Sequence, residues 1–115
     1  MSHRCATRSR KRVTTPEHAD LQEKLKEAGN KLVVIDFYAT WCGPCKMIAP
    51  KLETLSEEMD DIVILKVDVD QCEALVSDYD VTSMPTFVFI KNGEKLESFS
   101  GANYEKLKEL ILKHK

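Results

Sequence analysis

Hydrophobic positions follow a helical period early in the chain and become a continuous run further on. Apolar residues recur at helical spacing from Leu21 to Ala28, and Thr15-Pro16-Glu17 before them is typical of a helix start. Leu32–Tyr38 is apolar except for Asp36, which is the pattern of a strand buried on both faces of a sheet. These patterns predict a helix followed by a central strand.

The remaining chain alternates strands and helices. Cys42 to about Met59 predicts a long helix with one apolar stripe, and Asn92-Gly93 predicts a tight hairpin turn. Other predicted strands are Ile62–Val69, Thr86–Ile90 and Lys95–Phe99, and other predicted helices are Cys72–Tyr79 and Tyr104–His114. With a short edge strand around Lys11–Thr14, the order β-α-β-α-β-α-β-β-α predicts an α/β fold. Its central mixed β-sheet has four to five strands and is flanked by four helices on its two faces.

Charge separates the chain into two parts. Residues 1–12 hold five basic side chains and no acidic one, whereas the rest holds 12 basic and 19 acidic side chains, so charges of +5 and −7 give the net −2. We therefore expect a flexible basic leader over residues 1–15 and one domain over residues 16–115. An acidic domain argues against nucleic-acid binding, and no apolar run reaches the length of a membrane span.

The leader allows several interpretations. A plain solvated tail is the simplest one. Arg10-Lys11-Arg12 also fits a nuclear-import signal, and an arginine-rich, acid-free segment fits a mitochondrial transit peptide, although this one is short and lacks an amphipathic apolar face. No apolar secretory signal precedes the domain. We expect a cytoplasmic protein, with the nucleus as a second compartment and the mitochondrion as the weaker alternative.

Two of the four cysteines form a CxxC motif in Trp41-Cys42-Gly43-Pro44-Cys45-Lys46, where the predicted strand gives way to a helix. Unpaired N–H groups at a helix start favour a thiolate, and Lys46 adds positive charge. Gly43 and Pro44 shape a tight redox turn between the two sulfurs. A zinc site would need a second ligand pair at close spacing, and the histidines offer none, so we expect no metal.

This motif resembles the active site of the thioredoxins, most of all the animal cytosolic type. The resemblance runs in consistent order from about Ala19 to Lys113. The other segments that carry it are Val34–Ala39 with its aspartate, Ser83–Thr86 with its proline, Lys91–Gly93 and Ser100–Asn103.

The resemblance implies roles for the two cysteines and two charged residues. Cys42, expected to be the more exposed sulfur, is the nucleophile, and Cys45, expected to be more buried, is the resolving cysteine. Asp36 assists proton transfer at Cys45, and Lys66 could tune it as a counter-ion. The alternatives are that Asp36 is a solvent-facing carboxylate at a strand edge, and that Lys66 is an ordinary lysine reaching out from the sheet.

The resemblance also implies a docking surface for substrates around Cys42. Its residues are Trp41, Met84, Pro85, Gly101 and Ala102, with a cis peptide bond before Pro85 and strand-like hydrogen bonding at Met84. Trp41 has a simpler interpretation as a core residue. Thioredoxins of this type often carry a cysteine at the position of Cys72, so the resemblance implies a regulatory role for its oxidation. The interpretation favoured here is a spare surface thiol.

The expected function is that of a protein-disulfide reductase and electron carrier. No cofactor is expected on the chain itself, because it lacks a dinucleotide fingerprint; FAD and NADPH belong to the partner, thioredoxin reductase. Expected substrates are disulfide-containing proteins, including peroxiredoxin-like and reductase-like targets, and the expected state is a monomer. Two alternatives stay open. One is a secretory disulfide oxidase or isomerase, which usually has His in place of Pro44, and the other is a scaffold that binds partners without turnover.

Overall fold

The computed structural model describes residues 6–7 and 17–115. Their strands are β1 (Ala6–Thr7), β2 (Leu32–Tyr38), β3 (Ile62–Asp68), β4 (Thr86–Lys91) and β5 (Glu94–Ser100). Their helices are α1 (Glu17–Ala28), α2 (Gly43–Glu58), α3 (Glu73–Asp78) and α4 (Tyr104–His114). None of the helices in this described part is long and apolar enough to cross a membrane.

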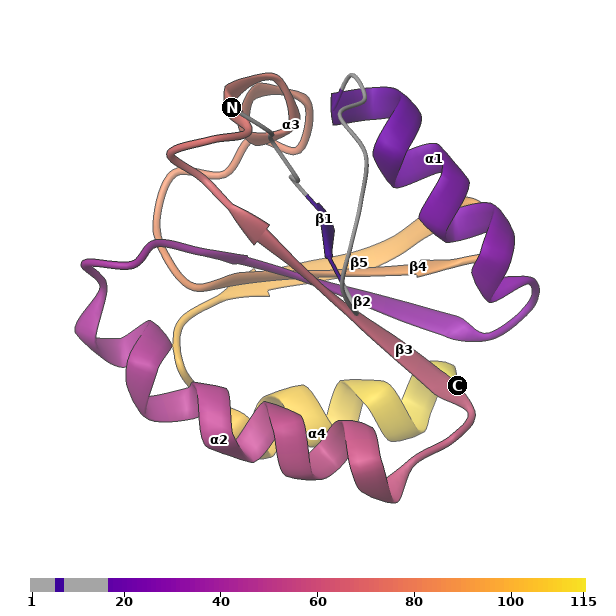
Figure 1. Cartoon of the computed structure of the whole chain (residues 1–115). Helices are drawn as coiled ribbons and strands as arrows, with labels where there is room; N and C mark the ends of the chain where they lie inside the picture. The colour runs from indigo at the N-terminus through magenta and orange to yellow at the C-terminus, as the bar shows by residue number, and fades with distance from the viewer. Residues whose placement is uncertain (1–5, 8–16) are drawn as a thin grey trace.

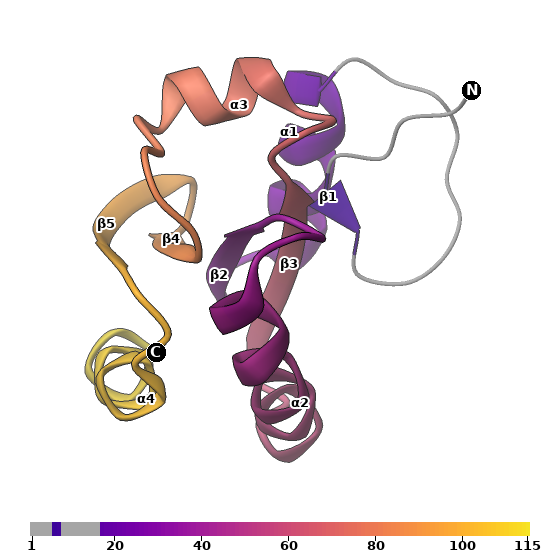
Figure 2. The same cartoon turned by 90° about the vertical axis from the view of Figure 1, so that its left-hand side faces the viewer.

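The strands form one mixed sheet in the order β1-β3-β2-β4-β5. β2 and β3 are parallel, with register from Leu32↔Ile62 to Tyr38↔Asp68, whereas β4 runs antiparallel to β2 and β5 antiparallel to β4. Figure 1 shows α1 and α3 on one face of the sheet and α2 and α4 on the other, and Figure 2 shows the same layers from the side. The predicted α/β fold with four flanking helices is confirmed.

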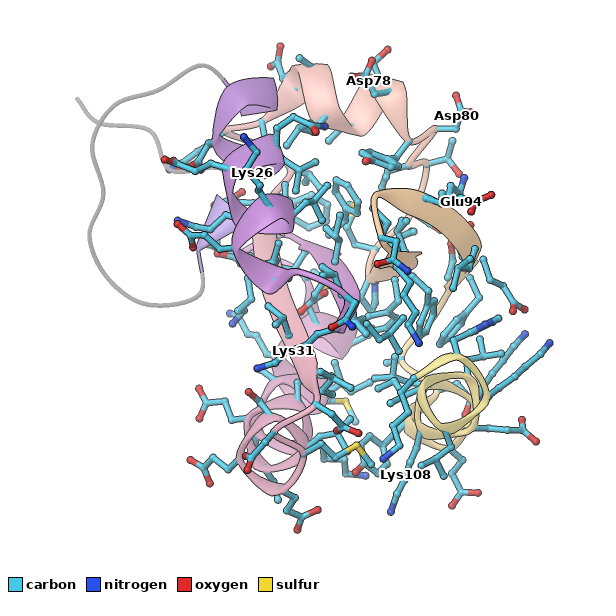
Figure 3. All side chains as sticks on the ribbon, turned by 90° about the vertical axis from the view of Figure 1, so that its right-hand side faces the viewer. Lys26, Lys31, Asp78, Asp80, Glu94 and Lys108 are labelled. Carbon is cyan, nitrogen blue, oxygen red and sulfur yellow. A yellow bond between two sulfur atoms is a disulfide. The ribbon has the colours of Figure 1, made fainter. Side chains whose placement is uncertain are left out.

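Alternate side chains of β2 point to the two faces of the sheet, which explains why the run is apolar at every position but Asp36 and Tyr38. Val33 and Phe37 pack into a cluster with residues of α1 and α3, while Leu32 and Val34 pack into a second cluster with residues of α2 and α4. Most charged side chains stay outside these layers, as the labelled residues in Figure 3 illustrate, and Asp36 within β2 is an exception. The sheet is therefore covered on both faces.

Local signals explain most of the element ends. The hairpin turn at Asn92 and Gly93 has φ of 55° and 80°, as a two-residue turn between β4 and β5 requires. Asn103 begins α4, its side chain accepting a hydrogen bond from the Lys106 N–H at 3.0 Å. The predicted strand at Lys11–Thr14 and the predicted helix start at Thr15-Pro16 lie outside the described residues, as does most of the predicted leader.

Candidate active site

The cysteine pair lies at the start of α2, shortly after the end of β2. Cys42 is the N-cap of α2 in extended backbone conformation, and Cys45 lies in the first turn. The two side chains are joined in a disulfide, with their Cα atoms 5.3 Å apart. Gly43 and Pro44 occupy the first helical positions, where the missing N–H of proline leaves no hydrogen bond unmade.

The helix start presents hydrogen-bond donors to the first sulfur. The Cys45 N–H donates to Cys42 Sγ at 3.1 Å, and no acidic side chain lies in the first turn of α2. This N–H and the positive end of the helix dipole stabilise negative charge on Cys42 once the disulfide opens. The chemistry that follows is reversible exchange between dithiol and disulfide.

Exposure does not separate the two cysteines in this form of the protein. Cys42 is 6 % exposed and Cys45 is 5 % exposed, and both pack against Ala39. The expected difference in exposure between Cys42 and Cys45 is therefore not seen in the disulfide form, in which both residues belong to one buried cluster. What distinguishes Cys42 is its position at the helix start.

Asp36 is a buried carboxylate on the α2 side of the sheet. It follows Leu32 and Val34 at strand alternation, so it faces the same layer, and it is only 3 % exposed. Burial raises the pKa of Asp36 from 3.8 to about 6, and the positive charge of Lys66 partly opposes that rise. The alternative of a solvent-facing aspartate is wrong.

Lys66 is the neighbour of Asp36 in the parallel register of β2 and β3. It is partly exposed, and its Nζ lies 5.0 Å from the centre of the Tyr38 ring. Asp36 Oδ1 is buried with no hydrogen-bond partner among the described residues. An unsatisfied buried oxygen of this kind is costly unless the carboxyl group is protonated or binds water.

The loop before β4 packs against the cysteine pair. The peptide bond between Met84 and Pro85 is cis, as the resemblance implied, and Met84 packs against the cluster of Cys42 and Cys45. The Gly101 N–H donates to the Pro85 carbonyl at 2.8 Å, which brings the end of β5 beside this loop. Gly101 has a φ of 109°, which favours glycine, and Ala102 next to it is exposed.

Trp41 is 64 % exposed, so its interpretation as a core residue is wrong. Its indole Nε1–H donates to Asp70 Oδ2 at 2.9 Å, which fixes one edge of the ring. Asp70 is the site residue that sequence reasoning missed. The available signal was the parallel pairing of two strands: Tyr38 is level with Asp68, so the segments that follow them must meet.

Cys72 requires a correction. It is fully buried, directly before α3, in the cluster on the α1 and α3 side, so the interpretation as a spare surface thiol is wrong. The burial follows from its place at the start of a short helix that turns its apolar side to the sheet. Among the described residues, no group of three or more His, Cys, Asp or Glu side chains could hold a metal ion.

A disulfide that joins the N-cap of a helix to its first turn, after a central strand that carries a buried carboxylate, defines a thiol–disulfide oxidoreductase. Its reactive group is the cysteine pair itself. Comparison with known proteins agrees with this class and narrows it. Residues 12–113 match the Thioredoxin family.

Relatives are similar over most of the chain. Thioredoxin-T of Drosophila melanogaster is 58% identical to this chain, and the match covers 83% of this chain and 61% of that protein. Thioredoxin of Homo sapiens is 56% identical, and the match covers 78% of this chain and 86% of that protein. The X-ray structure of Fasciola hepatica thioredoxin superposes with a TM-score of 0.83 at 52% identity, covering 85% of this chain and 94% of that one. The chain belongs to the thioredoxin family, whose members act through a redox-active disulfide in cell redox homeostasis.

Proposed function

We propose that this protein is a protein-disulfide reductase in which Cys42 attacks substrates and Cys45 resolves the intermediate. The observation that carries the proposal is the hydrogen bond from the Cys45 N–H to Cys42 Sγ at the start of α2. A thiolate at Cys42 keeps that donor, whereas a thiolate at Cys45 would lie further into the helix, away from the free N–H groups.

In the first step, the Cys42 thiolate attacks one sulfur of a substrate disulfide. A bond forms between Cys42 and that sulfur, and the other substrate sulfur leaves as a thiolate that takes up a proton. The chain and its substrate are then joined as a mixed disulfide. Gly43 and Pro44 hold the turn so that Cys45 stays within reach.

In the second step, Cys45 loses its proton and attacks Cys42. The Cys42–Cys45 disulfide forms, the substrate leaves with two thiols, and two electrons have passed to the substrate. Asp36 is the proposed proton acceptor, acting through water, because a carboxyl group with a pKa of about 6 exchanges protons readily near neutral pH. Lys66 is the proposed counter-ion that keeps this pKa from rising further.

Substrates dock on the surface around Cys42. Its proposed members are Trp41, Met84, Pro85, Gly101 and Ala102. An exposed aromatic ring supplies apolar contact, and the backbone at Met84 supplies hydrogen bonds to an extended segment of the substrate. Because neither kind of contact demands a particular substrate sequence, the surface suits many disulfide-containing proteins, including peroxiredoxin-like and reductase-like targets.

The proposed partner that restores the dithiol is thioredoxin reductase, which supplies electrons from NADPH through its own FAD. This protein would act as a monomer in the cytoplasm, with the nucleus as a second compartment. The test is NADPH oxidation by the full chain with thioredoxin reductase and insulin as the disulfide substrate. We expect turnover that disappears in Cys42→Ser. Serine is a favourable N-cap, so this variant keeps its fold.

A second variant separates the two cysteines. Cys45→Ser is expected to accumulate mixed disulfides with substrate, visible as a mass increase that a reductant removes. Absence of adducts would refute the assigned order of attack. If Asp36→Asn showed the same exchange rate as wild type at every pH, Asp36 would have no part in the mechanism. Binding of a partner that survives alkylation of Cys42, without turnover, would favour the scaffold alternative.

A further inference from the structure

Four polar side chains lie together at the carboxyl ends of β2 and β3. Asp36 is level with Lys66, and Tyr38 is level with Asp68, in the parallel register of the two strands. Strand alternation places all four on the face of the sheet that α2 and α4 cover. The exchange mechanism uses Asp36 and Lys66 but assigns nothing to Tyr38.

Tyr38 contacts both the cysteine pair and the lysine. Its partly buried side chain packs against the cluster of Ala39, Cys42 and Cys45. On the β3 side, the Lys66 Nζ lies 5.0 Å from the centre of the Tyr38 ring, a distance at which an ammonium group is attracted to the face of an aromatic ring. The ring therefore bridges the redox centre and Lys66.

We propose that Tyr38 is a positioning residue that holds the ammonium group of Lys66 near Asp36 and thereby controls how readily Asp36 releases its proton. The inference rests on the proposed role of Asp36 in proton transfer and deepens it. A lysine has a flexible four-carbon stem and normally carries its ammonium group into water. Attraction to the ring face keeps the group over the strand ends instead.

Lys66 is the charge on which the acidity of Asp36 depends. Burial raises the pKa of Asp36, and the positive charge of Lys66 opposes that rise. The sheet neighbour of Asp36 on β4 is Phe87, which carries no charge. The buried side chains of α2 and α4 are apolar apart from Cys45, which is held in the disulfide. Displacement of the ammonium group would therefore leave the effect of burial largely unopposed.

The phenol of Tyr38 stays neutral while it holds the lysine. Burial raises the pKa of Tyr38 above its ordinary value of 10.0, and the negative charges of Asp68 and Asp36 raise it further. Asp68 is itself fixed by the loop that follows it, because its Oδ1 accepts a hydrogen bond from the Asp70 N–H at 2.9 Å. Ionisation of Tyr38 therefore does not disturb a titration of Asp36 near neutral pH.

The test measures the pKa of Asp36 by carbon-13 NMR of its carboxyl group in the oxidised full chain, between pH 4 and pH 8. Tyr38→Leu keeps an apolar side chain but removes the ring. We expect the pKa of Asp36 to be higher than in wild type by about 0.5, because Lys66 is released toward water. Tyr38→Phe is the matched control. It keeps the ring face, so its Asp36 should titrate close to wild type.

A second background separates the charge of Lys66 from simple burial. Lys66→Met removes the charge and keeps an apolar stem, so it should raise the pKa of Asp36 at least as far as Tyr38→Leu does. Adding Tyr38→Leu to Lys66→Met should then produce no further rise. The same rise in both backgrounds, or no rise in Tyr38→Leu, would overturn the proposal. Tyr38→Met gives the same comparison should Tyr38→Leu not fold.

Insulin reduction tests the proposed function separately, since the NMR titration needs no turnover. A wild type that reduces insulin but shows no coupling between Tyr38 and Lys66 would refute this inference alone. Coupling in a wild type that reduces no insulin would refute the reductase function alone. Where both hold, the pH at which the resolving step is half-maximal should rise in Tyr38→Leu by the same amount as the pKa of Asp36, because the proton acceptor must be ionised.

Discussion

Replacing Asp36 by asparagine should stabilise the protein at neutral pH. Asn has nearly the same shape as Asp but carries no charge, so the change removes the cost of holding an ionised carboxylate in a layer of apolar side chains. Asp36 is 3 % exposed, and Lys66 offsets only part of that cost. The expected effect therefore depends on pH in a defined direction.

The shift in pKa sets the magnitude. A group whose pKa rises from 3.8 in the unfolded chain to about 6 in the folded one favours folding only while it is protonated. Below pH 3.8 the wild type therefore loses no stability relative to the Asn variant. As the pH rises from 3.8 through about 6, the wild type becomes progressively less stable than the variant. A shift of roughly two units corresponds to about 3 kcal/mol, which the variant gains in full at pH 7 and above.

The assay is unfolding of the oxidised protein in guanidinium chloride, followed by circular dichroism at pH 3.5 and pH 7.5. Asp36→Asn should exceed wild type in free energy of unfolding by about 3 kcal/mol at pH 7.5 and by little at pH 3.5. The matched control is Asp60→Asn, because Asp60 is exposed and should show no comparable gain. An equal difference at both pH values, or no difference at either, would refute burial of the charge as the cause.

Three further predictions concern single contacts. Asp70→Ala removes the hydrogen bond to Trp41, so the fluorescence anisotropy of this sole tryptophan should fall and the KM for insulin should rise by about two- to tenfold, with little change in kcat. Gly93→Ala places a side chain at φ of 80°, and the free energy of unfolding measured in urea should fall by about 1 kcal/mol. His114→Ala should raise the pKa of Glu97, measured by carbon-13 NMR, because a hydrogen bond from His114 at 2.8 Å holds it low.

Each of these changes has a matched comparison. Asp70→Asn keeps an acceptor oxygen and should behave as wild type, and equal losses in both variants would point to charge instead. Gly43 also has open space at its Cβ position but no positive φ, so Gly43→Ala should not lose stability. Lys113→Ala should raise the pKa of Glu97 less than His114→Ala, since the hydrogen bond is the larger cause. A larger rise in the pKa of Glu97 in Lys113→Ala than in His114→Ala would contradict the hydrogen bond as the larger cause.

Much of the fold could be predicted because each pattern had a single physical cause. The nearly continuous apolar run Leu32–Tyr38, interrupted only by Asp36, requires that both faces of its strand be covered, and β2 has those bounds. The Asn92-Gly93 pair supplies the positive φ that a two-residue hairpin needs. The helix start at Cys42 was predictable for the same reason, since glycine and proline begin the helix that follows.

Two of the missed features depend on contacts between segments far apart in the sequence. Asp70 meets Trp41 only because two parallel strands end level with each other, and no local pattern encodes that register. Cys72 lies among Asp, Gln and Glu in the sequence, which suggests exposure, yet α3 turns that position inward. Cys42 and Cys45 are buried alike in the disulfide form, a redox state that the sequence alone does not specify.

The hydrogen bond from the Cys45 N–H to Cys42 has a consequence for recognition. The donor already points at the sulfur while that sulfur is neutral and bonded, so opening the disulfide requires little rearrangement of the backbone at the helix start. We therefore expect the backbone around Cys42 to keep nearly the same shape in the oxidised and reduced forms. A partner that binds only one of the two forms would then distinguish it chiefly by the charge and reactivity of Cys42 Sγ.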